Sequence, residues 1–243
     1  MIDWHCHILP GLDDGPRNIE QSLTMAGLLA RYGFTEIHCT PHLIRDCFEA
    51  SNSEVRQVIR ELQQRICDNS IPLTLLPGRE YYLNEYLPAY LEDPLPLGDS
   101  CQILVEIPPR TTDDMVRQLL QSVIRAGFTP VIAHPERCRL LEPEAERTAA
   151  RGFFNTIKNA LTGGHDDSQE QELTDSTGNP LLDYLRELGC SFQGNLGSFG
   201  GFYGNQVKAN AEILRSKGVY DRYGSDLHAA EHADRILQPL KDN

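Results

Sequence analysis

Histidines and acidic residues stand at the end of one apolar run after another along this chain. The run that opens the chain carries His5 and His7 two positions apart, and a late run carries Asp226 and His228 with the same spacing. On a β-strand, residues i and i+2 point to the same face, so each pair can hold one metal ion. A chain that repeats this arrangement builds one site from several strand ends. The other candidate ligands at run ends are His42, Glu80, Glu106 and His134.

Strand-like and helix-like segments alternate along the chain, which predicts a parallel sheet. Because 243 residues fit one α/β barrel and about seven strands can be counted, we expect a single domain, residues 1–243, with a distorted (β/α)7 TIM-like barrel. In such barrels the active site lies at the carboxyl ends of the strands, where these ligands fall. The predicted strands are 1–7, 36–42, 73–80, 103–107, 129–134, 191–196 and 223–228, and the predicted helices are 17–32, 53–66, with Ser53 as N-cap, and 113–126.

Composition excludes several classes of protein. The net charge of −13 argues against a nucleic-acid binder, and no apolar run approaches the roughly 18 residues of a membrane span. No basic and apolar leader precedes Asp3, so we expect a cytoplasmic protein. The seven cysteines contain no CxxC pair, and a disulfide framework is not expected.

One stretch, at about residues 163–180, is polar and has no hydrophobic period. His165, Asp166 and Asp167 within it are metal-ligand types, but nothing apolar nearby would hold them in place. A solvated surface loop is the favoured interpretation.

Imidazoles combined with carboxylates and no thiolate suit Mn, Fe, Zn or Mg, and several carboxylates imply more than one ion. Two or three ions stabilise both the attacking and the leaving oxygen of an in-line displacement, which favours phosphoester hydrolysis. Arg137, three residues after His134, offers a planar fork for two phosphate oxygens. For His38 alone, we expect instead a core histidine.

Two other motifs compete with this interpretation. The segment His38–Arg45 matches H-C-x5-R, the signature of cysteine-based tyrosine phosphatases. However, Pro41 removes a backbone donor from the phosphate cradle, and no glycine allows its tight turn. The segment Gly194–Gly201 lacks dinucleotide spacing, so it predicts an active-site loop with Ser198 facing the substrate.

The order of these motifs resembles a known family, the bacterial manganese-dependent tyrosine-protein phosphatases of capsule and exopolysaccharide synthesis, within the polymerase and histidinol phosphatase (PHP) superfamily. The resemblance implies the distorted barrel, a trinuclear site most suited to Mn²⁺, and a partner, the tyrosine-rich tail of an autophosphorylated bacterial kinase. The motifs that carry it are Asp3-x-His5-Cys6-His7-x-Leu9-Pro10-Gly11-x-Asp13-Asp14-Gly15-Pro16, Thr40-Pro41-His42, Gly78-x-Glu80, Glu106, Ala133–Arg137, Asn195-x-Gly197-Ser198-x-x-Gly201-x-Tyr203-Gly204 and Ser225-Asp226-x-His228. The ligands it implies are His5, His7, Asp14, His42, Glu80, Glu106, His134, Asp226 and His228.

The resemblance also implies that Arg137 contacts the phosphate. Family members carry a second arginine about five residues after the last histidine, where this chain has Ala233 and the nearest arginine is Arg235. The segment between Arg137 and Gly197 is about 30 residues longer than the family pattern.

The expected activity is therefore hydrolysis of phosphotyrosine in a protein by attack of a metal-bound hydroxide. A phenolate leaving group, with a pKa of about 10, departs without a strong general acid. Two alternatives stay open at this point. One is a small-molecule phosphoesterase of the histidinol-phosphate type on the same fold, and the other is a catalytically silent metal-binding module.

Overall fold

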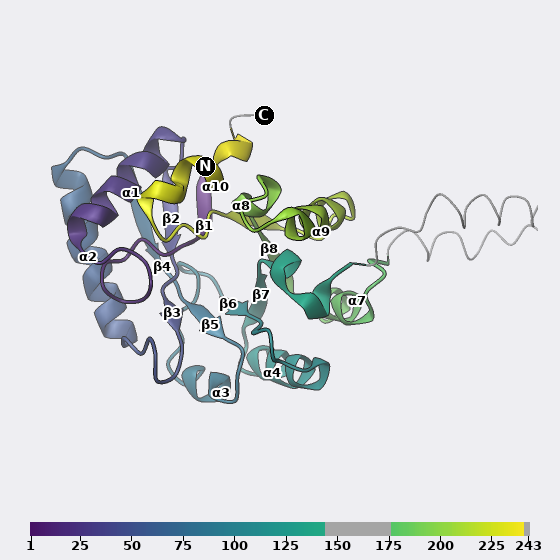
Figure 1. The fold of residues 1–243 in the computed structure, drawn as a ribbon. Coiled ribbons are helices and arrows are strands. Elements are labelled where there is room, and N and C mark those ends of the chain that lie inside the picture. Colours follow the sequence, from purple (N-terminus) through teal and green to yellow (C-terminus); the bar gives the residue numbers. More distant parts are fainter. Residues whose placement is uncertain (144–175, 241–243) are drawn as a thin grey trace, which may run out of the picture.

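A curled parallel sheet forms the centre of the molecule, and helices cover its outer side (Figure 1). The computed structural model describes residues 1–143 and 176–240. Every strand pair in the two sheets is parallel, as the alternation of segments predicts. The strands are β1 (Ile2–Cys6), β2 (Glu36–Cys39), β3 (His42–Leu43), β4 (Thr74–Pro77), β5 (Glu80–Tyr82), β6 (Gln102–Glu106), β7 (Thr129–Ala133), β8 (Ser191–Asn195) and β9 (Arg222–Gly224).

Two of the predicted strands are each interrupted. Residues 36–42 form β2 and then β3, while 73–80 form β4 and the start of β5. The first halves belong to a sheet ordered β1-β2-β4, and the second halves begin a sheet ordered β3-β5-β6-β7-β8-β9. Pro41 lies at the first interruption, and since it has no N–H it cannot donate to a continuous ladder. The two sheets together occupy seven strand positions, which confirms the distorted sevenfold barrel.

The last strand returns to the first. Asp226 N–H donates to the His5 carbonyl at 2.7 Å, and His7 N–H donates to the Leu227 carbonyl at 3.1 Å. The approach requires Gly224, because a Cβ there would lie 2.5 Å from the Cβ of His5. The predicted strand 223–228 is therefore short in the structure, and its final residues follow β1 as an irregular segment.

Side-chain caps fix where the long helices begin. Asn18 caps the helix Ile19–Arg31, and Thr112 caps the helix Asp113–Arg125. The second helix starts at Ser51, not at the predicted Ser53, because Ser51 and Glu54 form a reciprocal capping box. The helices are α1 (Ile19–Arg31), α2 (Asn52–Asp68), α3 (Leu87–Tyr90), α4 (Asp113–Arg125), α7 (Pro180–Glu187), α8 (Leu196–Phe199), α9 (Asn205–Ser216) and α10 (Ala233–Ile236), with 3₁₀ turns η1 (Pro135–Arg137), η2 (Arg139–Leu141), η3 (Ala230–His232) and η4 (Gln238–Leu240).

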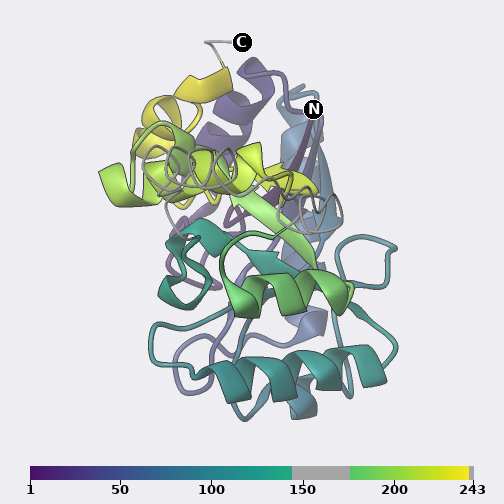
Figure 2. The ribbon, with the colours of Figure 1, turned by 90° about the vertical axis from the view of Figure 1, so that its right-hand side faces the viewer.

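The apolar core lies mainly between the sheet and its helices. One cluster packs β1, β2 and β4 against α1 and α2, and another packs β5–β8 against α4, α7 and α9. Helices α4 and α7 lie side by side on the outside of the sheet, where Gln121 donates to the hydroxyl of Tyr184 (Figure 2). Inside the barrel, a small plug of Leu97, Leu104, Val131 and Ala133 meets Trp4.

Three further expectations can be compared with the structure. All seven cysteines are free thiols, as predicted. None of the described helices combines the length and apolar character that a membrane span requires. The expected polar loop at about 163–180, with His165, Asp166 and Asp167, falls mainly on residues outside the described ranges.

Candidate metal centre

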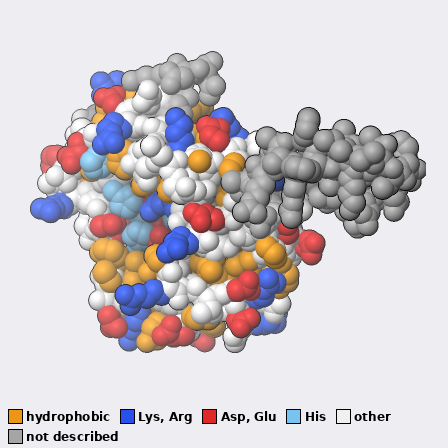
Figure 3. All heavy atoms as spheres, turned by 45° about the vertical axis from the view of Figure 1, so that its right-hand side comes forward, with side chains coloured by type: hydrophobic (Ala, Val, Ile, Leu, Met, Phe, Trp, Pro, Cys, Tyr) orange, Lys and Arg blue, Asp and Glu red, His pale blue; other side chains and the backbone are white. Residues whose placement is uncertain are grey.

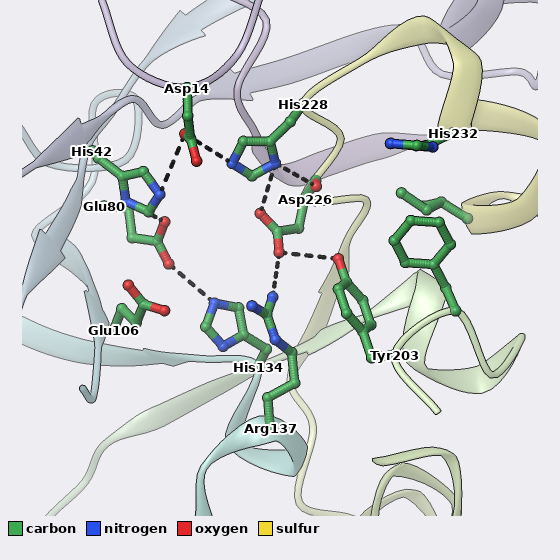
Figure 4. A pocket seen from close by; sticks show the side chains of 12 residues that line it. Asp14, His42, Glu80, Glu106, His134, Arg137, Tyr203, Asp226, His228 and His232 are labelled. Atoms are coloured by element: carbon green, nitrogen blue, oxygen red, sulfur yellow. Dashed lines mark hydrogen bonds and ion pairs between the residues drawn. The ribbon is translucent and has the colours of Figure 1, made fainter. Parts of the chain in front are cut away.

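The structure brings the nine predicted ligands to one place, the carboxyl end of the barrel, and Figure 4 shows those that line the cavity there. His5 and His7 point to this interior because they alternate with Cys6, which packs in the outer hydrophobic core. Within the described residues, three groups of ligand atoms each lie within 4.8 Å of one another. The groups are His7, Asp14, His42 and His228; His5, His7 and Glu80; and His42, Glu80 and Glu106.

Glu80 stands at the centre of the arrangement. Its Oε2 lies 3.2 Å from Nε2 of both His5 and His7 and 3.0 Å from Nδ1 of His42. Its other oxygen, Oε1, lies 3.1 Å from Nε2 of His134. One carboxylate thus lies against four imidazoles, so a cation held by these rings would also be within reach of Glu80.

Asp226 joins the same cluster from the other side. Its Oδ1 lies 3.4 Å from Nε2 of His5 and 3.3 Å from Nε2 of His7. Asp14 lies nearer the surface, with Oδ1 at 3.3 Å from Nε2 of His228 and 3.7 Å from Nε2 of His42. The structure therefore gathers all nine ligands that the resemblance implies.

The donor atoms fit divalent cations better than they fit one another. The Nε2 atoms of His5 and His7 face each other at 3.0 Å in a fully buried position, although two neutral imidazoles gain at most one hydrogen bond there. Nδ1 of His42 and Oε2 of Glu80 are buried and, although 3.0 Å apart, neither has a hydrogen bond within the described residues. Buried polar atoms without partners are costly, and a cation among these donors would satisfy them.

The charges and the burial within the cluster shift the pKa values of its histidines in opposite directions. Burial alone would lower the pKa of His5, but the carboxylates of Glu80 and Asp226 outweigh it and raise that pKa to about 9. Burial, together with the charge of Arg137, lowers the pKa of His134 to about 4, so this ring is neutral and ready to bind a cation. Burial beside Glu80 raises the pKa of Glu106 to about 7. The cluster therefore holds a dense set of opposed charges, many of them on buried side chains.

Two side chains orient the ligands from behind. Asp13 Oδ2 lies 2.7 Å from Nδ1 of His7, and Gln193 Oε1 lies 2.8 Å from Nδ1 of His5. Each contact fixes the ring so that Nε2 faces the cluster, as is usual behind metal-binding histidines. Sequence reasoning did not assign these roles, although Asp13 lies in the opening motif. Gln193 gave no signal beyond its position near the end of a predicted strand.

Two ligands adopt a left-handed backbone that non-glycine residues rarely occupy. His134 has φ 32° and Asp226 has φ 51°, and each directly follows the end of a strand or its extension. Such conformations cost on the order of 1–3 kcal/mol each, and they turn the side chains back into the barrel. The surrounding contacts must therefore offset the free energy that these two backbone conformations cost.

Arg137 reaches the cluster from η1, as the sequence predicts. Its Nη1 donates to Oδ2 of Asp226 at 2.6 Å, and its guanidinium lies over the ring of Tyr203 at 4.4 Å. Asn195 donates to the same Asp226 oxygen at 2.9 Å. The fork of Arg137 is therefore held on two sides at the edge of the metal cluster.

A buried carboxylate anchors the loop that carries Arg137. Glu136 accepts hydrogen bonds from Asn195 N–H, the Ser198 hydroxyl and the Tyr220 hydroxyl. Ser198 is fully buried by this contact. The expectation that Ser198 faces the substrate is therefore wrong: its hydroxyl supports Glu136 because the α8 turn directs it inward.

A cavity of about 430 Å³ opens beside the ligands. Figure 3 shows histidine side chains reaching the surface on this face, bordered by hydrophobic side chains. The structure does not bring Arg235 into the cavity, since its guanidinium lies over the ring of Phe202 at 4.9 Å. A contact of Arg235 with phosphate stays a prediction. The lining residues that sequence reasoning did not single out are Phe202, His232 and Ile236.

The competing cysteine motif is buried away from this cavity. Cys39 is fully inaccessible in the core between sheet and helices, and burial strongly raises the pKa of its thiol. His38 is a core histidine, as predicted: it is 4% exposed, and its ring stacks on Trp4 at 4.5 Å. Neither residue belongs to the ligand groups.

Comparisons with known proteins agree with this geometry. The tyrosine-protein phosphatase YwqE of Bacillus subtilis is 31% identical over 230 residues, which cover 94% of this chain and 77% of that protein. The tyrosine-protein phosphatase CpsB of Streptococcus pneumoniae is 32% identical over 152 residues, covering 60% of this chain and 61% of the relative. The chain thus spans less than two thirds of the second relative.

Solved structures show the same relationship. A structure from work on YwqE and CpsB, described as metal-dependent tyrosine phosphatases, superposes with a TM-score of 0.76 and 29% identity over 99% of this chain and 84% of that one. The histidinol phosphate phosphatase of Lactococcus lactis, at 13% identity and a TM-score of 0.51, covers 99% of this chain and 92% of its own, and shares the fold alone. Residues 1–156 match the family model described as capsular polysaccharide synthesis, CpsB/CapC, and the chain belongs to that family.

Proposed function

We propose that this protein is a metal-dependent phosphatase that hydrolyses phosphotyrosine in a protein substrate. The observation that carries the proposal is the convergence of nine His, Asp and Glu side chains in one cluster, which opens on a cavity that Arg137 also lines. The relatives named tyrosine-protein phosphatases support the choice of ester. A core of this size gains nothing from so many converging polar groups unless they bind a ligand.

We infer that the nine ligands hold two or three divalent ions, with Mn²⁺ as the first candidate and Fe, Zn or Mg as others that suit the donors. When bound, such ions polarise the phosphoryl oxygens and activate water near neutral pH. Asp13 and Gln193 fix the rings of His7 and His5 so that their Nε2 atoms stay directed at the cations.

Arg137 supplies the phosphate contact in this proposal. Its Nη1 is bonded to Asp226, and its other N–H groups have no hydrogen bond within the part of the chain that the structure describes. Stacking on Tyr203 holds the guanidinium plane, so the fork meets two phosphate oxygens without first being ordered. Charge that develops on those oxygens in the transition state strengthens the contact.

The leaving group explains why an aryl ester suits the site. A phenolate with a pKa of about 10 departs without a strong general acid, whereas an alkoxide does not. In the physiological setting we propose the phosphorylated tyrosine-rich tail of a bacterial kinase of capsule or exopolysaccharide synthesis as the substrate, since the matching family is described as one of capsular polysaccharide synthesis and the relatives are named tyrosine-protein phosphatases.

A small-molecule phosphoesterase of the histidinol-phosphate type is the second candidate, because the Lactococcus enzyme shares the fold. The deciding assay compares the turnover of a phosphotyrosine peptide with that of histidinol phosphate. We expect the peptide to have the higher kcat/KM. A preference for histidinol phosphate would reverse the assignment, and turnover of neither ester by metal-loaded protein would favour a silent binding module.

The same assay separates metal from thiol chemistry. EDTA should abolish turnover and Mn²⁺ should restore it, while Cys39→Ser should retain most of it because Cys39 is buried away from the cavity. An enzyme that resists EDTA and is inactivated by iodoacetamide would refute the proposal.

A further inference from the structure

The cavity beside the metal ligands has two chemically different walls. One consists of the carboxylates and imidazoles of the cluster. The opposite wall consists of Phe202, Ile236 and His232, which follow β8 and the β9 segment in the chain. The first wall suits a phosphate with its cations, whereas the second is mainly apolar, with His232 as its polar member.

Phe202 is held in a fixed position. The ring of Tyr203 meets it edge-on at 5.0 Å between centroids, and the ring of His232 lies at 5.3 Å, tilted by 59°. The guanidinium of Arg235 lies over the ring at 4.9 Å. Contacts on several sides restrict the motion of Phe202, so little entropy is lost when a second ring packs against it.

Arg137 connects the two walls. It donates to Asp226 in the metal cluster, and its guanidinium stacks on Tyr203, the chain neighbour of Phe202. A phosphate on Arg137 therefore shares one cavity with the Phe202 wall. The cavity, at about 430 Å³, falls within the range of sites that bury a small ligand.

We propose that Phe202, with Ile236 and His232, receives the aromatic ring of the substrate's leaving group and so determines the preference for aryl over alkyl phosphate monoesters. The inference rests on the proposed phosphatase function and adds the residues that select the ester. The ring packs on Phe202 in the ground state as well as in the transition state, so its loss raises KM more than it lowers kcat.

Binding of two non-hydrolysable analogues to Mn²⁺-loaded protein tests the wall without turnover. We expect phenylphosphonate to bind more tightly than methylphosphonate, and Phe202→Ala to weaken phenylphosphonate by about tenfold, the scale of a lost aromatic pair with its buried surface. Methylphosphonate affinity should fall much less. Phe202→Leu, which keeps apolar bulk, decides the matter if the alanine variant does not fold.

Tyr223→Leu is the matched control, because Tyr223 is a partly exposed aromatic residue in β9 that does not line this cavity. Metal content and phenyl phosphate turnover are measured on every variant. Equal affinity of the wild type for the two phosphonates, or an equal loss of both in the Phe202 variants, would overturn the aryl wall. Wild-type protein that prefers phenylphosphonate but hydrolyses no aryl phosphate would instead retain the wall and refute the proposed function.

Discussion

At the residue scale, the site depends on side chains that few alternatives can replace. Lysine keeps the charge of Arg137 but loses the planar fork that spans Asp226 and a phosphate. We expect Arg137→Lys to lower kcat/KM by about 10²–10³, as does removal of a transition-state donor. Steady-state kinetics with metal content checks this.

Retention of more than about a third of wild-type kcat/KM, on the scale of an exposed ion pair, would show that another residue holds the phosphate. Arg235 and Arg45 are the next candidates. Arg45 is half exposed and pairs with Asp46 and Glu49, so its loss alone should be mild.

Ligand loss separates metal binding from folding. His7→Ala and Asp226→Ala each remove one ligand from a cluster that surrounding strands already frame. We expect both variants to lose metal and activity while they melt cooperatively, near the Tm of EDTA-treated wild type. Metal analysis with thermal melting is the measurement. Loss of the folded state in both would mean that the ions are structural.

At the element scale, the sequence predicted the order of the strands and helices better than the residues at which they begin and end. Periodicity located β1, β6, β7 and the helices α1, α2 and α4, because these segments carry regular apolar faces. The interruptions at Thr40–Pro41 and Gly78–Arg79 were missed, since a strand can read as continuous across a break that tertiary pairing imposes. Helices α7 and α9 were missed beside a long polar stretch.

The site residues were likewise predictable only where they leave a local pattern in the sequence. His5, His7 and Asp226 were found because ligands at i and i+2 leave a mark in the sequence. Phe202 and Ile236 reach the cavity only through the packing of α8 and α10, which leaves no local pattern. The support of Glu136 by Ser198 likewise depends on two segments 62 positions apart.

The start of α2 gives a test at this scale. Ser51→Ala removes the side-chain acceptor of Glu54 N–H and opens the capping box. We expect a loss of about 1 kcal/mol and a fall in Tm of about 2–4 °C. Ser53→Ala is the control, because Ser53 lies inside the helix and should change Tm less. A larger effect of Ser53→Ala than of Ser51→Ala would place the cap at the serine that the sequence predicted.

At the scale of the whole molecule, metal binding and pH are coupled. In metal-free protein the pKa of His5 is about 9, above its usual value of 6.5, because of Glu80 and Asp226. The attraction between protonated His5 and these two carboxylates stabilises the fold fully below about pH 6.5, and this contribution to the free energy of unfolding is lost as pH rises towards 9. A metal cation binds only the neutral imidazole. Cation affinity therefore increases as pH rises towards 9, and binding at lower pH releases the proton of His5.

The difference in Tm between Mn²⁺-loaded and EDTA-treated protein should therefore increase from pH 7 to pH 9. Differential scanning calorimetry at the two pH values measures it, with titration in buffers of different ionisation enthalpy as the check on proton release. A difference that shrinks towards pH 9 would contradict the linkage.

The pairing of the first strand with the segment after the last has a consequence for synthesis on the ribosome. His5 and His7 emerge early, while Asp226 and His228, which complete the same cluster, are added more than two hundred positions later. A nascent chain thus carries an incomplete site throughout translation and cannot assemble the whole of it until the segment after β9 has left the exit tunnel.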